Sequence, residues 1–179
     1  AVAAKQIVAF LEEALVSAEA AADLTRSLGE TGAATRLDQA RAAAYYADIS
    51  NQVSEARLIA ASEREALTRA LGLWGDDAKF DLPVRLPNLP MQLVNELTEM
   101  AINARSEVRD AYRAYNGFHE ISLRYENEIL PMGTIINEET LLKYNGMLVD
   151  AFELLATARE SIGMNIDAIE ARRNFFIAD

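Results

Sequence analysis

The sequence predicts an all-α fold in which two long antiparallel helical hairpins form a coiled-coil-like four-helix arrangement. Two turns support this prediction, GETGAAT at residues 29–35 and YNG at residues 144–146, because each interrupts a long stretch with helical apolar spacing. A proline-rich segment between these stretches, DLPVRLPNLP, cannot be helical. We therefore expect a first hairpin over residues 1–72, an extended connector over residues 73–90 and a second hairpin over residues 91–179.

Length and composition agree with one folded domain. The chain has 179 residues, of which 51% are hydrophobic and 25% are charged, so it can bury a sizeable core. It contains no cysteine, which excludes disulfides and thiolate metal sites but leaves the cellular compartment open. The formal net charge of -11 argues against a nucleic-acid partner, because phosphate neutralisation needs clustered lysine and arginine.

The chain as given is expected to be soluble. No stretch reaches the roughly twenty apolar residues that a membrane helix needs. Residues 1–10 lack the charged start and the apolar core of a signal peptide.

The first helical arm has apolar or small residues spaced by three and four, as in a heptad repeat. They are Ala4, Val8, Leu11, Leu15, Ala18, Ala22 and Thr25. Gly29 and Gly32 interrupt this spacing and predict a turn. Either Thr31 or Thr35 could cap the next helix, and Asp38 follows Thr35 by three residues as an acidic first-turn residue.

The second arm is predicted over residues 36–71 and has a similar spacing of apolar and small residues. They are Tyr45, Ile49, Val53, Ala56, Ala60 and Leu67. Small residues let two helices pack closely. Gly72 and Gly75 end this arm, and we expect Trp74 to bury its ring at the junction between helix and connector.

The connector contains Pro83, Pro87 and Pro90, which lack backbone donors and favour extended geometry in the residues before them. Its apolar residues alternate with proline rather than with glycine and serine. This composition favours a strap packed on the helices over a flexible linker.

The third arm is predicted to start near Met91, to carry aromatic residues on its apolar face and to break or kink at Pro131 and Gly133. The aromatic residues are Tyr112, Tyr115, Phe118 and Tyr125. Asn145 and Gly146 suit the left-handed conformation that ends a helix. The fourth arm, over residues 149–177, has one apolar stripe, formed by Phe152, Leu155, Ile162, Ile166 and Ile169.

Catalytic motifs are absent from the sequence, so no enzyme, no metal site and no cofactor are expected. His119 is the single histidine, whereas a helical di-metal site needs Glu-x-x-His motifs on two helices. We interpret it as a surface or seam residue. The tyrosine pairs have helical spacing, which favours packing over a stacking platform for nucleic acid.

Three motifs in this order resemble the TolC-like outer-membrane efflux proteins over nearly the whole chain. GAATRLDQARA and YNGMLVDAFELLATARE look like the two periplasmic hairpin tips of that family. Between them, REALTRALGLWG and DLPVRLPNLP are similar to the end of the returning helix and its leucine-proline equatorial connector. The resemblance implies the periplasmic helical-duct portion of a trimeric outer-membrane channel that exports small molecules or ions. It also implies a periplasmic adaptor (membrane fusion) protein and, through it, an inner-membrane transporter, together forming a tripartite pump.

The resemblance also implies which residues carry the function. The tip positions that match the adaptor-docking region are Gly32, Ala33, Thr35, Tyr144, Asn145, Gly146 and Met147. Asp150 and Glu153 are the nearest candidates for the acidic ring that narrows the closed entrance in that family. Two alternatives remain open: the two tip glycines only end helices, and the two acids belong to a solvated helix face.

The sequence departs from the family pattern, because the two strand hairpins that contribute to the outer-membrane barrel are missing. We expect a shortened form that starts after the first strand pair and omits the second, with a join near residues 101–105. A second interpretation, from another class, is a soluble all-helical scaffold or dimerisation module with no link to export.

Overall fold

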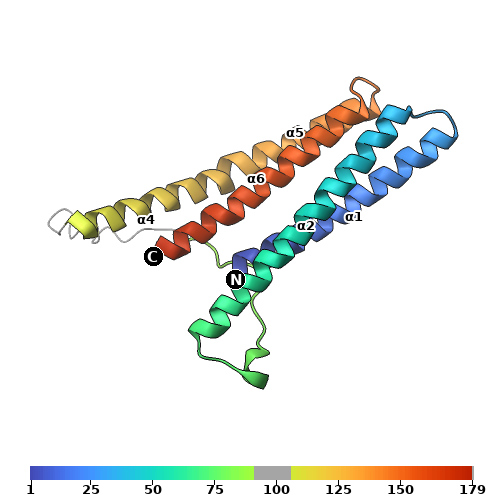
Figure 1. Ribbon diagram of the computed structural model, residues 1–179. Helices are drawn as coiled ribbons and strands as arrows, with labels where there is room; N and C mark the ends of the chain where they lie inside the picture. The colour runs from blue at the N-terminus through green and yellow to red at the C-terminus, as the bar shows by residue number, and fades with distance from the viewer. Residues whose placement is uncertain (91–105, 179) are drawn as a thin grey trace.

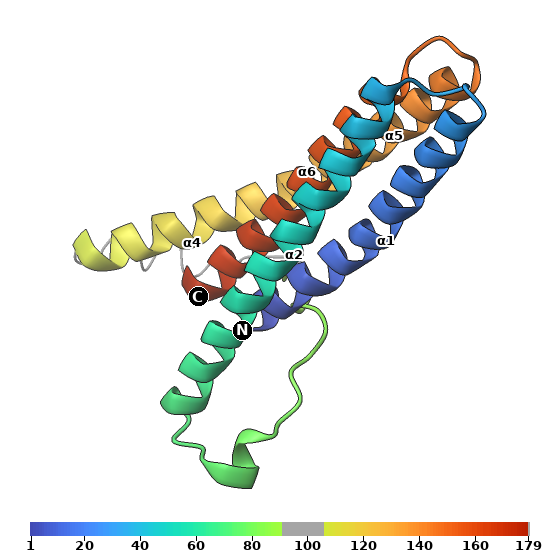
Figure 2. The ribbon, with the colours of Figure 1, turned by 45° about the vertical axis from the view of Figure 1, so that its right-hand side comes forward.

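The computed structural model describes residues 1–90 and 106–178 (Figure 1). Every regular element in these residues is a helix, and none of them lies in a strand. The all-α fold class is therefore confirmed. Figures 1 and 2 show an elongated arrangement of long helices, with the turns at residues 31–35 and 146–150 at the same end.

Helices α1 (Val2–Glu30) and α2 (Arg36–Ala70) lie side by side and run in opposite directions. Residues predicted from helical spacing form their buried contact, and these are Leu11, Ala18, Tyr45, Ile49, Val53 and Ala56. An exposed ion pair, with 2.6 Å between the Arg57 guanidinium and the Glu12 carboxylate, adds a second link. The three- and four-residue spacing thus identified the packed sides of both helices correctly.

Helices α4 (Ser106–Arg124) and α5 (Leu130–Asn145) form one rod through the π-helical turn η2 (Tyr125–Ile129). The helix therefore does not break at Pro131 or Gly133, and both residues lie inside α5. Figure 2 shows the rod changing direction near η2. The third arm was predicted to break or kink at these residues. The structure shows no break, and the rod changes direction near η2.

The π-helical turn explains how a proline is accommodated. The Leu130 N–H donates to the Tyr125 carbonyl, five residues earlier, which makes the turn wider than an α-helical turn. Pro131 has no N–H to donate, and its ring would clash with the carbonyl four residues earlier in a regular helix. Gly133 is buried and lets α6 approach closely, because a β-carbon there would lie 3.2 Å from Met164 Cε.

Helix α6 (Ala151–Ala178) connects the two halves of the chain. It packs against α4 and α5 on one side and against α1 and α2 on the other. Ile162 of α6 belongs to the same buried cluster as Leu11 and Ile49, so the helices share one core. The predicted α6 stripe is correct at Ile162 and Ile169, which are buried.

The same stripe prediction is wrong at Phe152, which is 50% exposed. Its ring lies under the Arg41 guanidinium of α2, 4.4 Å from the ring centroid. Phe152 is in the first turn of α6, next to the second tip. A cation–π contact therefore replaces burial at this position.

An aromatic cluster joins α4 to the end of α6. The Phe175 ring is buried, with its centroid 5.0 Å from Tyr115 and 5.3 Å from His119. His119 is also buried, and its Nε2 lies 3.1 Å from the Pro90 carbonyl oxygen. The single histidine is therefore a packing residue that also contacts the connector.

The connector includes a short 3-10 helix, η1 (Gly75–Ala78), and continues without regular secondary structure to residue 90. Side chains of α1 hold it through its backbone. Lys5 Nζ donates to the Leu82 carbonyl at 2.6 Å, and the Leu86 N–H donates to Gln6 Oε1 at 3.0 Å. These bonds keep the proline-rich segment against the start of α1.

The burial predicted for Trp74 is wrong, because this side chain is 83% exposed. Phe80 takes the place at the junction instead, with the Arg64 guanidinium 4.4 Å from its ring centroid. Arg64 also donates to the Phe80 carbonyl. The turn through η1 directs the chain back toward α2 after Trp74, so the later aromatic residue packs there. The predicted start of the third arm at Met91 and the predicted join near residues 101–105 lie outside the described residues.

Candidate functional site

The first tip, between α1 and α2, ends and restarts its helices with two local motifs. Gly32 has a φ of 77°, and the Ala33 N–H donates to the Leu28 carbonyl at 2.8 Å. This pattern is a Schellman motif, in which a left-handed residue follows the helix end. Thr35 then caps α2, and with Asp38 it forms a capping box.

The second tip, between α5 and α6, uses the same motif with a different residue at its centre. The Leu148 N–H donates to the Lys143 carbonyl at 2.9 Å, and the Met147 N–H donates to the Tyr144 carbonyl at 2.9 Å. Met147 has a φ of 56°, whereas Gly146 has a φ of -81°. The prediction that Gly146 adopts the left-handed conformation is therefore wrong, because that position falls one residue later.

A third helix end supplies a direct comparison. At the end of α2, Gly72 has a φ of 67°, and the Leu73 N–H donates to the Thr68 carbonyl at 3.1 Å. Two of these three equivalent positions are thus glycine, and the third is Met147. A β-carbon in this conformation costs roughly 1 kcal/mol compared with glycine. Met147 therefore occupies a position where its side chain lowers stability.

The Met147 side chain is also the most exposed large apolar side chain described, at 94%, and the adjacent Leu148 is 78% exposed. Little of either side chain packs on the described residues. An exposed apolar pair at a helix turn is typical of a surface that contacts a partner. The sequence analysis included Met147 in the site but not Leu148, although the exposed pair stands in one turn.

The other predicted tip residues have local structural roles or lie in solvent. Ala33 and Asn145 are exposed, and Tyr144 is partly buried. Asp150 accepts a hydrogen bond from the Glu153 N–H at 2.9 Å and so caps the start of α6. Asp150 and Glu153 are both exposed. Both tips lie side by side at one end of the molecule, as Figures 1 and 2 show.

Contacts between α2 and α6 fix the two tips relative to one another. The Arg159 guanidinium lies 3.2 Å from the Asp48 carboxylate and 5.6 Å from the centroid of the Tyr45 ring. Burial raises the pKa of the Tyr45 hydroxyl, and the nearby Arg159 charge opposes that shift. Together with the Arg41–Phe152 contact, these interactions hold the helix pairs together near the tips.

The second candidate surface is α5, which exposes apolar side chains on more than one side. These side chains, between 48% and 63% exposed, are Met132, Ile135, Ile136, Leu141 and Leu142. We call them the apolar α5 surface. A helix that is apolar all round is usually buried on several sides, but the described helix that packs along α5 is α6. The segment LPMGTIINEETLLKYN carries this signal in the sequence, since its apolar residues do not follow one stripe.

The described residues contain no group of three or more histidine, cysteine, aspartate or glutamate side chains placed to hold a metal ion. None of the helices in this part of the chain is both long enough and apolar enough to cross a membrane. Comparisons with protein-family models, with curated proteins and with solved structures found no match to this chain.

Proposed function

We propose that this chain is the periplasmic helical-duct portion of a trimeric outer-membrane efflux channel, which docks a periplasmic adaptor at its two tips. In this proposal the pairs α1–α2 and α5–α6 are the two coiled-coil-like hairpins, and residues 73–90 are the equatorial connector. The adaptor connects the duct to an inner-membrane transporter, so the chain takes part in transport without catalysis.

One observation carries the proposal: the second tip keeps an exposed methionine in a left-handed position that two equivalent helix ends give to glycine. Because Met147 lowers the stability of the chain and packs on little of it, a partner is the simplest reason for the side chain. Methionine suits a docking surface, since it is flexible and polarisable. Leu148 beside it enlarges the apolar contact.

The apolar α5 surface supports the trimeric part of the proposal. Five large apolar side chains on one helix remain in contact with solvent in the single chain. In a duct built from several copies, hairpins lie beside hairpins of the next copy, which would cover such a surface. A symmetric assembly buries the same residues in every copy.

Met147→Asn in the intact protein tests the docking role. Asparagine tolerates the left-handed conformation but removes the apolar side chain, so the fold is preserved while the contact is lost. We expect reduced cross-linking to the adaptor and reduced export-dependent resistance at a normal protein level. Leu71→Asn is a matched control, because Leu71 is an exposed apolar residue at a helix end far from the tips. Unchanged cross-linking and resistance in a Met147→Asn, Leu148→Asn double variant would count against the proposal.

The apolar α5 surface equally fits the second candidate function, an all-helical scaffold or dimerisation module. In that case a second copy covers α5 in a dimer, and the tips have no adaptor. The complete gene separates the two functions. A signal peptide and two blocks of alternating amphipathic strands support the export duct, and the lack of both supports the scaffold.

A further inference from the structure

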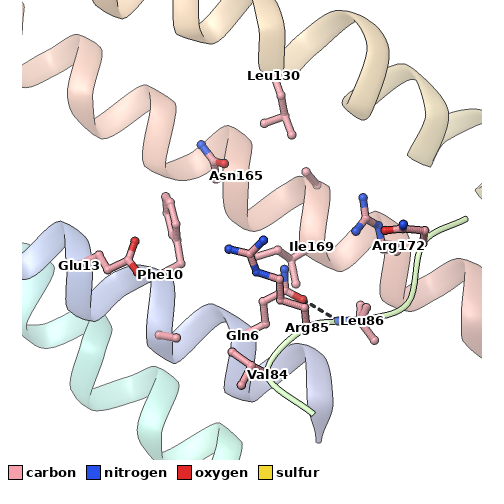
Figure 3. Close-up of a pocket in the computed structure, with 13 residues that line it drawn as sticks. Gln6, Phe10, Glu13, Val84, Arg85, Leu86, Leu130, Asn165, Ile169 and Arg172 are labelled. Atoms are coloured by element: carbon pink, nitrogen blue, oxygen red, sulfur yellow. Dashed lines mark hydrogen bonds between the residues drawn. The ribbon is translucent and has the colours of Figure 1, made fainter.

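A pocket lies where the connector crosses between the two helix pairs, far from the tips (Figure 3). Its volume is about 430 Å³, within the range of small-molecule sites in proteins. Residues of α1, the connector, α5 and α6 all line it. The pocket therefore forms only when segments distant in the sequence pack together.

The walls of the pocket combine apolar and polar side chains. Phe10 of α1, Val84 of the connector, Leu130 of α5 and Ile169 of α6 supply apolar side chains. The hydrogen bond from the Leu86 N–H to Gln6 Oε1, drawn in Figure 3, fixes the connector edge against α1. The connector side of the pocket is therefore held in place.

Arg85 supplies a positive charge to this pocket. Figure 3 shows its guanidinium extending from the connector into the space between α1 and α6. Within the described residues it has no ion-pair or hydrogen-bond partner, although the chain carries 28 acidic residues. Arg172, the other arginine lining the pocket, is already paired with the Glu126 carboxylate. The unpaired guanidinium is therefore available to an anion.

We propose that this pocket binds a small amphipathic monocarboxylate. The ligand carboxylate pairs with the Arg85 guanidinium in the fork geometry that arginine favours. Its apolar part packs against Phe10, Val84 and Ile169. Glu13 also lines the pocket, and its negative charge disfavours a ligand with a second anionic group. This site is separate from the tips and does not depend on the proposed export role.

Octanoate is the probe, titrated below its micellar concentration into isotopically labelled protein, and octanol is the uncharged comparator. We expect octanoate to bind at least tenfold more tightly than octanol. The largest amide shifts should fall at Gln6, Leu86 and Ile169. Octanoate that binds no more tightly than octanol, or shifts centred elsewhere, would overturn the proposal.

Two variants test the contributions of the Arg85 charge and of the apolar wall to binding separately. Arg85→Gln should lower octanoate affinity at least tenfold, to the level of octanol. Arg69→Gln is the control and should leave octanoate affinity unchanged, because Arg69 is exposed on α2 outside the pocket. Ala168→Leu should fill part of the pocket and weaken both ligands, with helical content and urea unfolding confirming the fold. Unchanged octanoate binding in both pocket variants would refute the site.

Discussion

At the residue scale, the residue in the left-handed position lowers stability at the second tip but not at the first. Gly32 and Met147 occupy equivalent positions in two Schellman motifs, at φ values of 77° and 56°. Glycine enters this region without a steric penalty, whereas a β-carbon approaches the following carbonyl oxygen. The two positions therefore respond to substitution in opposite directions.

We predict that Met147→Gly raises the free energy of unfolding by about 0.5–1 kcal/mol, since it removes the left-handed penalty and loses few contacts. Gly32→Ala should lower it by about 1 kcal/mol, because it introduces the same penalty. Urea unfolding of both variants measures the difference. A lower stability for Met147→Gly would mean that the methionine side chain packs on the chain in solution.

A second residue-scale prediction concerns the capping box at the start of α2. The Thr35 hydroxyl donates to Asp38 Oδ2 at 2.6 Å and the Thr35 N–H donates at 3.0 Å, which together hold the pKa of the Asp38 carboxyl below its ordinary value. A carboxyl whose pKa is lowered by folding stabilises the fold above its unfolded pKa, and that contribution is lost as the pH falls through the folded pKa.

Amide hydrogen exchange in the first turn of α2 should therefore accelerate relative to the rest of the helix as pH falls from about 5 to about 2. Asp38→Asn should show fast exchange already at neutral pH and no further relative change on acidification. Equal pH dependence in both proteins would show that the carboxylate adds nothing to the cap.

At the element scale, helix α5 depends on two small features. The π-helical turn before it makes room for Pro131, and Gly133 brings it close to α6. A β-carbon at Gly133 would lie 3.2 Å from Met164 Cε and 3.3 Å from Met164 Sδ, whereas one at Gly163 of α6 would meet no atom within 4 Å. The close α5–α6 contact therefore favours glycine at residue 133, whereas the space around Gly163 would admit a larger side chain.

We predict that Gly133→Leu lowers the free energy of unfolding by about 1–3 kcal/mol, because the new side chain overpacks the α5–α6 contact. Gly163→Ala should raise it by about 0.5–1 kcal/mol, since alanine favours a helix interior and has open space. Met164→Ala should recover part of the Gly133→Leu loss in a double-mutant cycle. Fully additive effects in that cycle would mean that the new side chain does not overpack against Met164.

At the scale of the whole molecule, long helices rather than a compact core determine the outline. Helix α2 alone has 35 residues and so measures about 52 Å at 1.5 Å per residue. We predict a radius of gyration clearly above the roughly 16 Å expected for a compact domain of this length. Small-angle X-ray scattering at several concentrations measures it and separates elongation from self-association. A value near 16 Å at infinite dilution would contradict this arrangement.

The sequence by itself determined the helices and most of their buried sides. Helical spacing identified Leu11, Ile49 and Ile162 as packing residues, because a repeat of three and four residues aligns them on one side whatever helix lies opposite. Local turn chemistry likewise left Thr31 and Thr35 as the candidate caps, and Thr35 caps α2 together with Asp38. Information of this kind lies within a few residues of each position, so one sequence is enough to read it.

Tertiary structure alone decided what depends on segments far apart in the chain. Trp74 and Phe152 were predicted to pack but are exposed, because no helix in the described part of the chain buries them. The left-handed position at the second tip falls on Met147 and not on Gly146. The apolar α5 surface is exposed because, among the described helices, α6 packs along one side of α5 and leaves its other sides uncovered. The Arg85 pocket needs the connector, α1, α5 and α6 together. Burial is set by which surfaces meet, and sequence spacing within one helix does not specify its neighbours.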